Sequence, residues 1–62
     1  MNSTIDYGDT VEVSEPKHED STHEHEFIGT VIGKSEWGTG NLVEDQDGEV
    51  FEVAEDEVTK VE

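Results

Sequence analysis

The sequence predicts a small all-β domain, and three observations lead to this fold class. Eight of the fourteen Leu, Ile, Val and Phe residues are Val, whose branched side chain suits a pleated sheet better than a helix. These apolar residues fall in five short blocks, and turn-forming residues such as Gly, Asp and Asn separate the blocks. This placement argues for a folded chain, although an apolar content this low approaches that of disordered proteins.

The first predicted strand follows a short N-terminal segment. Residues 1–7 predict a loose segment, and residues 8–62 predict the folded domain. A Gly-Asp turn leads into residues 10–14, where polar and apolar residues alternate as they do in a strand with one buried face. Residues 15–26 are polar throughout and hold the single proline and all three histidines, so we expect a long loop there.

The second predicted strand, residues 27–33, is the most apolar stretch of the chain. It contains Gly29 and Gly33, and glycines inside a strand predict a sharp bend or the close approach of another backbone. Residues 34–41, in which Gly and Thr surround Trp37, follow as a second loop.

The last part of the chain gives the clearest local pattern. Residues 42–45 and 49–53 are two strand-forming runs, and the turn between them contains Gly48, which can take a positive φ. Residues 54–57 are too few for a stable helix and fit a single 3₁₀ turn. Residues 58–61 complete the series as a fifth short strand.

The expected core takes apolar residues from every strand. Its predicted members are Val11, Val13, Phe27, Val31, Leu42 or Val43, Phe51, Val53 and Val58, with Ile28 and Ile32 covering the bent second strand.

Three stretches of the chain carry a resemblance to a known family: Gly8–Val13, Glu26–Ile32 and Val43–Val53. Within them, Phe27-x-Gly29-Thr30-Val31 is followed by Asp47-Gly48-Glu49-x-Phe51-x-Val53, which is similar to small uncharacterised bacterial and phage barrel proteins. The chain thus resembles SH3-like small barrels over about residues 8–61. The resemblance implies an all-β, SH3-like five-stranded small barrel with one 3₁₀ turn before the last strand. KOW-type barrels share the Gly-x-Val strand and bind RNA through basic loops, which this chain lacks.

The charge of the chain excludes several classes of partner. Eighteen Asp and Glu stand against three Lys, without any Arg, and the formal net charge is -15. Direct binding to nucleic acid or to an anionic membrane needs clustered Lys and Arg, so we expect neither. The chain has no Cys, which excludes disulfides, Cys-ligated zinc, iron–sulfur clusters and thiol catalysis.

The sequence also leads to expectations about the location and the oligomeric state of the protein. No apolar run reaches the roughly 20 residues that a membrane span needs, and residues 1–4 lack the basic and apolar regions of a signal peptide. We therefore expect a cytoplasmic monomer without a cofactor.

The three histidines, His18, His23 and His25, are candidate metal ligands. In an extended chain, side chains two residues apart point the same way, so His23 and His25 could hold Zn²⁺ or Ni²⁺ together with a carboxylate. A hydrated polar loop in which they have no special role explains the same pattern. His25, which shares the parity of Phe27, could also cap one end of the barrel.

Two aromatic residues outside the strands, Tyr7 and Trp37, are candidates for partner binding. An aromatic side chain in a loop can stack on a Pro, Lys or Arg of a partner, and SH3-like barrels commonly bind peptides between the corresponding loops. This analogy predicts an interaction face formed by Tyr7, His23, His25 and Trp37. The alternative is that Trp37 folds over the open end of the barrel and completes a thin core.

The carboxylates and the absence of a catalytic arrangement complete the functional prediction. Residues 44–47 and 55–57 could bind Ca²⁺ but lack the spacing of an EF-hand, and a solvated acidic face is the simpler interpretation.

A nucleophile needs a base held by a third group in a water-excluding pocket, which a polar loop on a thin barrel does not offer, so we do not expect an enzyme. The prediction is a non-enzymatic module that binds a protein or peptide, and a basic one given the charge. The alternative is an acidic inhibitor, or DNA mimic, that occupies the basic cleft of a nucleic-acid-binding protein.

Overall fold

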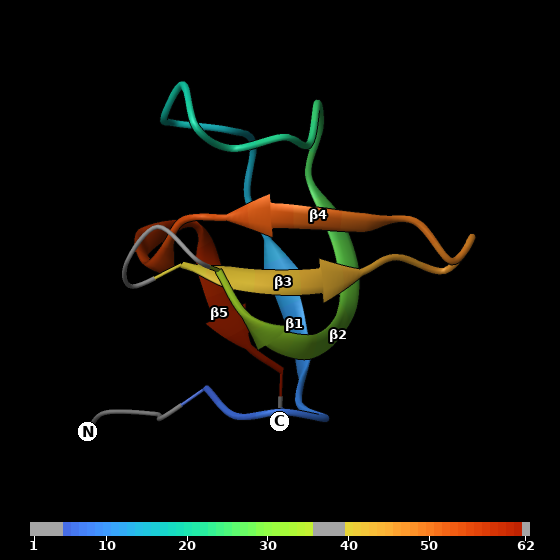
Figure 1. Cartoon of the computed structure of the whole chain (residues 1–62). Helices are drawn as coiled ribbons and strands as arrows, with labels where there is room; N and C mark the ends of the chain where they lie inside the picture. Colours follow the sequence, from blue (N-terminus) through green and yellow to red (C-terminus); the bar gives the residue numbers. More distant parts are fainter. Residues whose placement is uncertain (1–4, 36–39, 62) are drawn as a thin grey trace.

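The fold is all-β, as predicted, and its described residues form one 3₁₀ turn and five strands in one antiparallel sheet (Figure 1). The structure, a computed structural model, describes residues 5–35 and 40–61. The elements are β1 (Thr10–Val13), β2 (Phe27–Lys34), β3 (Asn41–Glu44), β4 (Val50–Val53), the 3₁₀ turn η1 (Glu55–Glu57) and β5 (Val58–Lys60). The strand order is β4-β3-β2-β1-β5, and each neighbouring pair is antiparallel. Among the described strands no pairing joins β4 to β5, so the sheet is open and its closure into a barrel stays a prediction.

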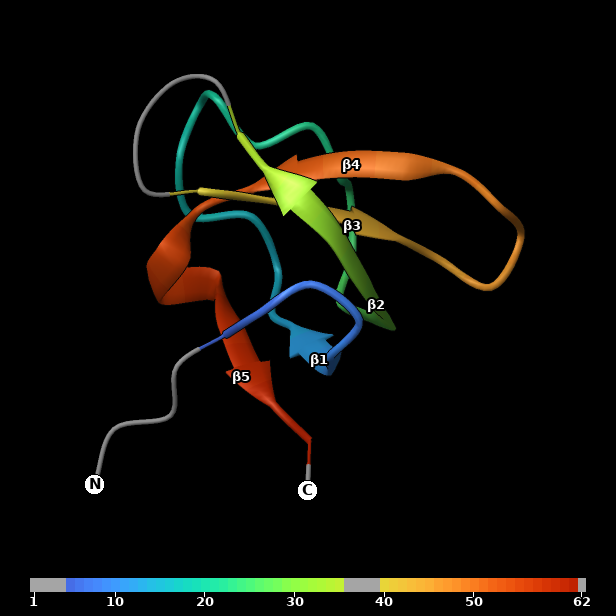
Figure 2. The same ribbon diagram turned by 60° about the horizontal axis from the view of Figure 1, so that its bottom comes forward.

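The long strand β2 connects two layers. It pairs with β1 along its first half and with β3 along its second half, and its register against β3 shifts between Val31 and Gly33. A bulge of this kind bends a strand and increases its twist. As a result the β3–β4 pair lies across β1 and β5, and the inner faces of the two layers enclose the core (Figures 1 and 2).

Five valines form the fully buried centre of the protein. Strict alternation in β1 turns Val11 and Val13 inward and leaves Thr10 and Glu12 exposed, as the sequence predicts. Val31, Val43 and Val53 complete the cluster, and the partly buried Ile5, Phe27, Phe51 and Val58 pack against it. Val43 rather than Leu42 is fully buried, and Ile28 is 45% exposed because it is out of phase with Val31 on β2.

The predicted close backbone approach in β2 occurs at Gly29, which is buried against β3. A Cβ atom placed on Gly29 would collide with the backbone carbonyl oxygen of Glu44 and would lie 2.7 Å from Cγ1 of Val43. Only glycine fits there without displacing β3, because real Cβ atoms do not approach other heavy atoms so closely.

The long loop between β1 and β2, residues 14–26, covers the outer edge of β4. The backbone N–H of Thr22 donates to the carbonyl oxygen of Glu52 at 3.1 Å, and the N–H of Glu52 donates to Thr22 Oγ1 at 2.9 Å. The loop is thereby fixed next to the β3–β4 hairpin, as its position above β4 in Figure 1 shows. This arrangement brings the loop and the hairpin turn together at one end of the sheet.

The turn of the β3–β4 hairpin has the predicted geometry, with φ of 89° at Gly48. Asp45 fixes the turn, because its Oδ1 accepts the N–H groups of both Asp47 and Glu49 at 2.9 Å. The N–H of Asp45 also donates to the carbonyl oxygen of Glu49 at 2.8 Å. The carboxylates on this turn are therefore held on a well-defined backbone.

The positive φ leads to a testable expectation for Gly48. Gly48→Val should lower the free energy of unfolding by about 1–2 kcal/mol, because a β-branched residue is strained in this conformation. Gly48→Asn is the matched control and should cost less, since Asn tolerates positive φ. Urea unfolding followed by circular dichroism measures both values, and equal midpoints for the two variants would contradict the assigned strain.

Candidate functional site

A pocket of about 420 Å³ lies where the long loop, the start of β2 and the β3–β4 hairpin meet. Its floor is formed by Phe27 of β2 and Phe51 of β4, whose ring centroids are 5.4 Å apart at an interplanar angle of 57°. Both phenyl rings also pack against the valine core, so the floor continues the core to the surface. The two rings are adjacent but tilted relative to each other, so the floor is apolar and angled.

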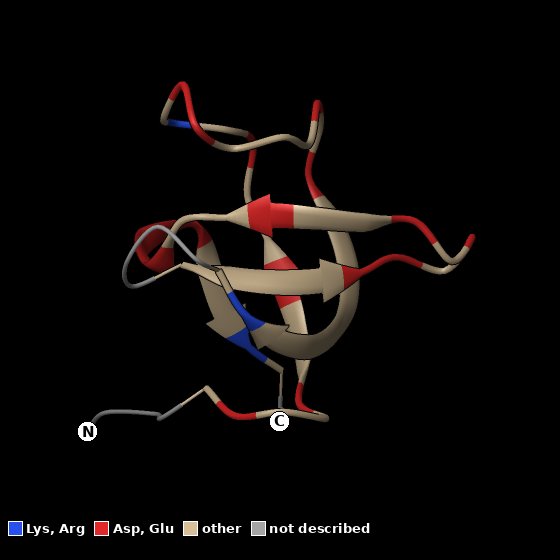
Figure 3. Ribbon diagram, viewed as in Figure 1, with Lys and Arg blue, Asp and Glu red and all other residues tan. Residues whose placement is uncertain are grey.

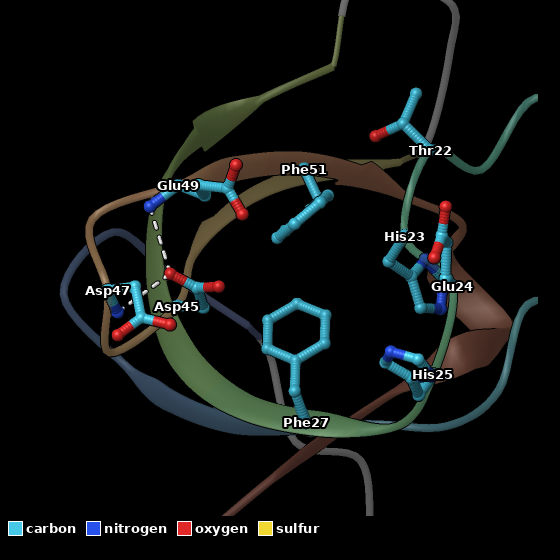
Figure 4. A pocket seen from close by; sticks show the side chains of 9 residues that line it. All are labelled: Thr22, His23, Glu24, His25, Phe27, Asp45, Asp47, Glu49 and Phe51. Atoms are coloured by element: carbon cyan, nitrogen blue, oxygen red, sulfur yellow. Dashed lines mark hydrogen bonds between the residues drawn. The ribbon is translucent and has the colours of Figure 1, made fainter.

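Four carboxylates surround this floor. Figure 4 shows Asp45, Asp47 and Glu49 of the hairpin on one side and Glu24 of the long loop on the other. In the described part of the chain, none of the four is paired with a cationic side chain, since the ion pairs found there are His18–Asp56 and Lys60–Asp9. Figure 3 shows the same preponderance of acidic residues along the loop and the hairpin turn. The pocket therefore has a negative rim over an apolar floor.

His23 is part of the pocket wall and is almost completely buried. It is 4% exposed, and its ring meets Phe27 edge-on with centroids 5.7 Å apart. Its Nε2–H donates to the carbonyl oxygen of Ser14 at 2.8 Å, because a carbonyl can only accept. Its Nδ1 is buried and has no hydrogen-bond partner among the described residues. His23 therefore lines the pocket as part of its wall, and its partner-binding role stays a prediction.

The other two histidines lie in different surroundings. His25 is exposed and lines the same pocket, whereas Nε2 of His18 lies 3.0 Å from Oδ1 of Asp56 beside η1. The described residues contain no group of three or more His, Cys, Asp or Glu arranged to hold a metal ion. The three histidines proposed as metal ligands are therefore not brought together in one such group.

Tyr7, one of the two aromatic residues of the predicted face, does not line this pocket. It is 77% exposed. Residues 5–9 lie at the bottom of Figure 1, below the strands, whereas the long loop lies at the top. Trp37 lies outside the described residues. Of the four predicted partner-binding residues, only His23 and His25 are seen to share one pocket.

Glu57 is a structurally central residue that the sequence analysis missed. Its side chain is 1% exposed, although it belongs to an Ala-Glu-Asp-Glu run that looks like ordinary acidic surface. Its carboxylate accepts the N–H of Lys17 at 2.6 Å, the N–H of Ala54 at 2.8 Å and the hydroxyl of Ser21 at 2.7 and 2.9 Å. Glu57 thereby ties the long loop to η1. One sequence feature could have indicated this role: Glu57 lies three residues after the N-cap Ala54, a spacing that lets its carboxylate accept a hydrogen bond from the N–H of the cap residue.

The protonation of Glu57 is set by two opposing effects. Burial alone would raise the pKa of the carboxyl, because it disfavours the charged form. The N–H donors of Lys17 and Ala54, the Ser21 hydroxyl and the nearby His23 outweigh this and hold the pKa of Glu57 below its ordinary value. The ionised carboxylate is therefore the form that the fold selects.

The sequence did not predict the pocket either, because each of its residues was assigned to another role. Phe27 and Phe51 were predicted as core residues, and the hairpin carboxylates as solvated surface or Ca²⁺ ligands. The signal that could have found the pocket is a Phe at or next to the start of a strand, as at Phe27 and Phe51, with acidic residues in the adjoining loop and turn.

No helix in residues 5–35 and 40–61 is long and apolar enough to cross a membrane. Comparisons of the chain with protein-family models, with curated proteins and with solved structures found no match.

Proposed function

We propose that this chain is a non-enzymatic protein-interaction module, an SH3-like small barrel whose pocket binds a positively charged segment of a partner protein. The observation that carries the proposal is the pocket itself, with four carboxylates around a floor of two phenyl rings. The proposed module acts as a monomer in the cytoplasm and uses no cofactor.

The pocket offers two separate contributions to binding. The unpaired carboxylates attract a cationic segment from a distance and orient it, an effect that salt screens. The phenyl floor contributes apolar contact and cation–π attraction, which persist when salt has screened the longer-range part. A partner with one cationic side chain over the floor and others near the rim would gain from the electrostatic attraction and from the contact with the phenyl rings.

The hydroxyl in the pocket is committed to structure, which agrees with a non-catalytic role. Thr22 contributes the only hydroxyl among the described lining residues, and its Oγ1 accepts the N–H of Glu52. A nucleophile would instead need a neighbouring base held by a third group.

The alternative function, an acidic inhibitor or DNA mimic, uses the whole charge of the chain rather than one pocket. Acidic residues in the long loop, the hairpin turn and η1 support this alternative (Figure 3). The two functions differ in what happens when charge is removed at particular positions. Mimicry depends on many spaced carboxylates, whereas pocket binding depends on those at the rim.

Two triple variants with equal charge change distinguish these functions. One removes rim charges by Glu24→Gln, Asp47→Asn and Glu49→Gln; the other removes charges outside the pocket by Glu12→Gln, Glu15→Gln and Asp20→Asn. We expect the rim variant to bind an end-blocked nine-residue peptide of charge +3 about tenfold more weakly than the unsubstituted chain, and the other variant to stay within about threefold, since each exposed pair contributes modestly.

Isothermal titration calorimetry at 0.05 and 0.5 M NaCl is the measurement. At 0.5 M the Debye length is roughly 4 Å, so a pocket complex with apolar contact should retain measurable affinity. Equal losses in the two triple variants, together with complete loss of binding at 0.5 M, would reject the pocket in favour of charge mimicry.

A further inference from the structure

We infer that the side chain seated in the pocket is an arginine of the partner; the inference rests on the proposed function and names its ligand. The argument begins with the arrangement of charge around the floor. In Figure 4 the phenyl rings of Phe27 and Phe51 reach the middle of the pocket from opposite sides, and carboxylates stand at both ends of this apolar surface. A ligand seated there would contact the face of a phenyl ring and present positive charge toward both sides of the pocket.

A compact metal ion does not match this arrangement. Metal ions need three or more donors that converge on one point, and the described residues contain no such group. The carboxylates of Glu24 and Asp47 belong to different segments on opposite sides of the phenyl floor. A cation that spreads its charge over several atoms suits separated carboxylates better than a point charge does.

The phenyl floor favours guanidinium over ammonium. A guanidinium group is planar and weakly hydrated, so it can stack on an aromatic ring at a small desolvation cost. A lysine ammonium is compact and strongly hydrated, and it loses more on leaving water for a partly apolar pocket. The three-carbon stem of arginine also covers apolar surface while its charged end reaches the rim.

The rim supplies acceptors for a ligand that can only donate. Asp45 uses Oδ1 to hold the turn, and the side chains of Asp47 and Glu49 make no hydrogen bond within the described part of the chain. A carboxylate with both oxygens available can accept two parallel N–H groups from one guanidinium. Arginine carries five N–H donors and no acceptor, which complements such a surface.

The test is a nuclear magnetic resonance titration of the ¹⁵N-labelled full chain with acetyl-Gly-Arg-Gly-amide. We expect saturable shifts confined to residues 22–27 and 45–51, and nuclear Overhauser contacts from the arginine side chain to both phenyl rings. The same peptide with Lys should bind at least threefold more weakly. The peptide with citrulline, which keeps the shape and removes the charge, should lose binding within the measured range.

Variants and outcomes separate this inference from the proposed function. Glu49→Gln should weaken the arginine peptide two- to fivefold, and the matched Glu12→Gln on the outer face of β1 should leave it unchanged. Equal affinity for the Lys peptide, stronger binding of spermidine at the pocket, or missing contacts to the phenyl rings would overturn the arginine assignment while the cationic-segment function stands. If neither the Arg nor the Lys peptide binds, and the +3 peptide also fails, both are overturned.

Discussion

Glu57→Ala is expected to unfold most of the protein at room temperature. The substitution leaves the N–H of Ala54 without its acceptor in a buried site, and the N–H of Lys17 and the hydroxyl of Ser21 without theirs in partly buried sites. A buried donor left unsatisfied costs about 1–3 kcal/mol and a partly buried one less, so the sum is comparable with the roughly 3–5 kcal/mol that a domain of this size has in total. Glu55→Ala on the same 3₁₀ turn is the control and should change the free energy of unfolding by less than about 0.5 kcal/mol.

Circular dichroism and amide-proton dispersion measure the folded fraction of these two variants. If Glu57→Ala retains the dispersed spectrum and urea midpoint of Glu55→Ala, the carboxylate does not hold the long loop in the way described above.

The milder variant Glu57→Gln isolates the charge of this carboxylate through its pH dependence. The folded-state pKa of Glu57 lies below its ordinary value, so ionisation stabilises the fold above the unfolded-state pKa of about 4.3. This stabilisation is lost as the pH falls through the folded-state pKa. The difference in free energy of unfolding between the unsubstituted chain and Glu57→Gln should therefore be constant from pH 7 to about 5 and should narrow below about pH 4. A difference that widens on acidification would contradict the sign of the pKa shift.

Gly29→Ala is expected to produce the second large effect: it should lower the free energy of unfolding by at least about 2–3 kcal/mol. The new methyl group would collide with a backbone carbonyl of β3 rather than with a flexible side chain, so β2 and β3 must separate to accommodate it. Gly33→Ala in the same strand is the matched control, because its Cβ would lie 3.6 Å from Cδ1 of Leu42, an ordinary contact. Urea unfolding compares the two variants. Similar urea midpoints for the two variants would mean that β2 and β3 are far enough apart at Gly29 to accommodate a methyl group.

The sequence predicted those parts of the fold that depend on local patterns. Alternation placed Val11 and Val13 inward, the glycine content of residues 27–33 indicated the close approach at Gly29, and Gly48 marked the hairpin turn. Each of these features is decided by neighbouring residues, because the side-chain period of a strand and the φ of a turn are local properties. The burial of Ile28 was overestimated, although alternation alone places it on the opposite face of β2 from Val31.

The site could not be predicted in the same way, because its residues come together only through the loop. Glu57 is one of eighteen carboxylates, and the three donors that set it apart come from Lys17, Ser21 and Ala54. His23 was expected as an exposed ligand, yet the carbonyl of Ser14 draws its ring into the wall. Long-range hydrogen bonds of this kind leave no spacing in the sequence.

The attachment of Thr22 to β4 also determines how much of that edge strand is left uncovered. An uncovered edge strand offers a row of free N–H and C=O groups to the edge of any other sheet, and β4 carries the exposed Val50 beside its half-buried Phe51. The long loop occupies the N–H and C=O of Glu52, and its acidic residues repel a second copy that carries the same charge. The segment that forms one wall of the pocket therefore also covers part of the β4 edge, and we expect substitutions that release it to make that edge available for pairing with another sheet.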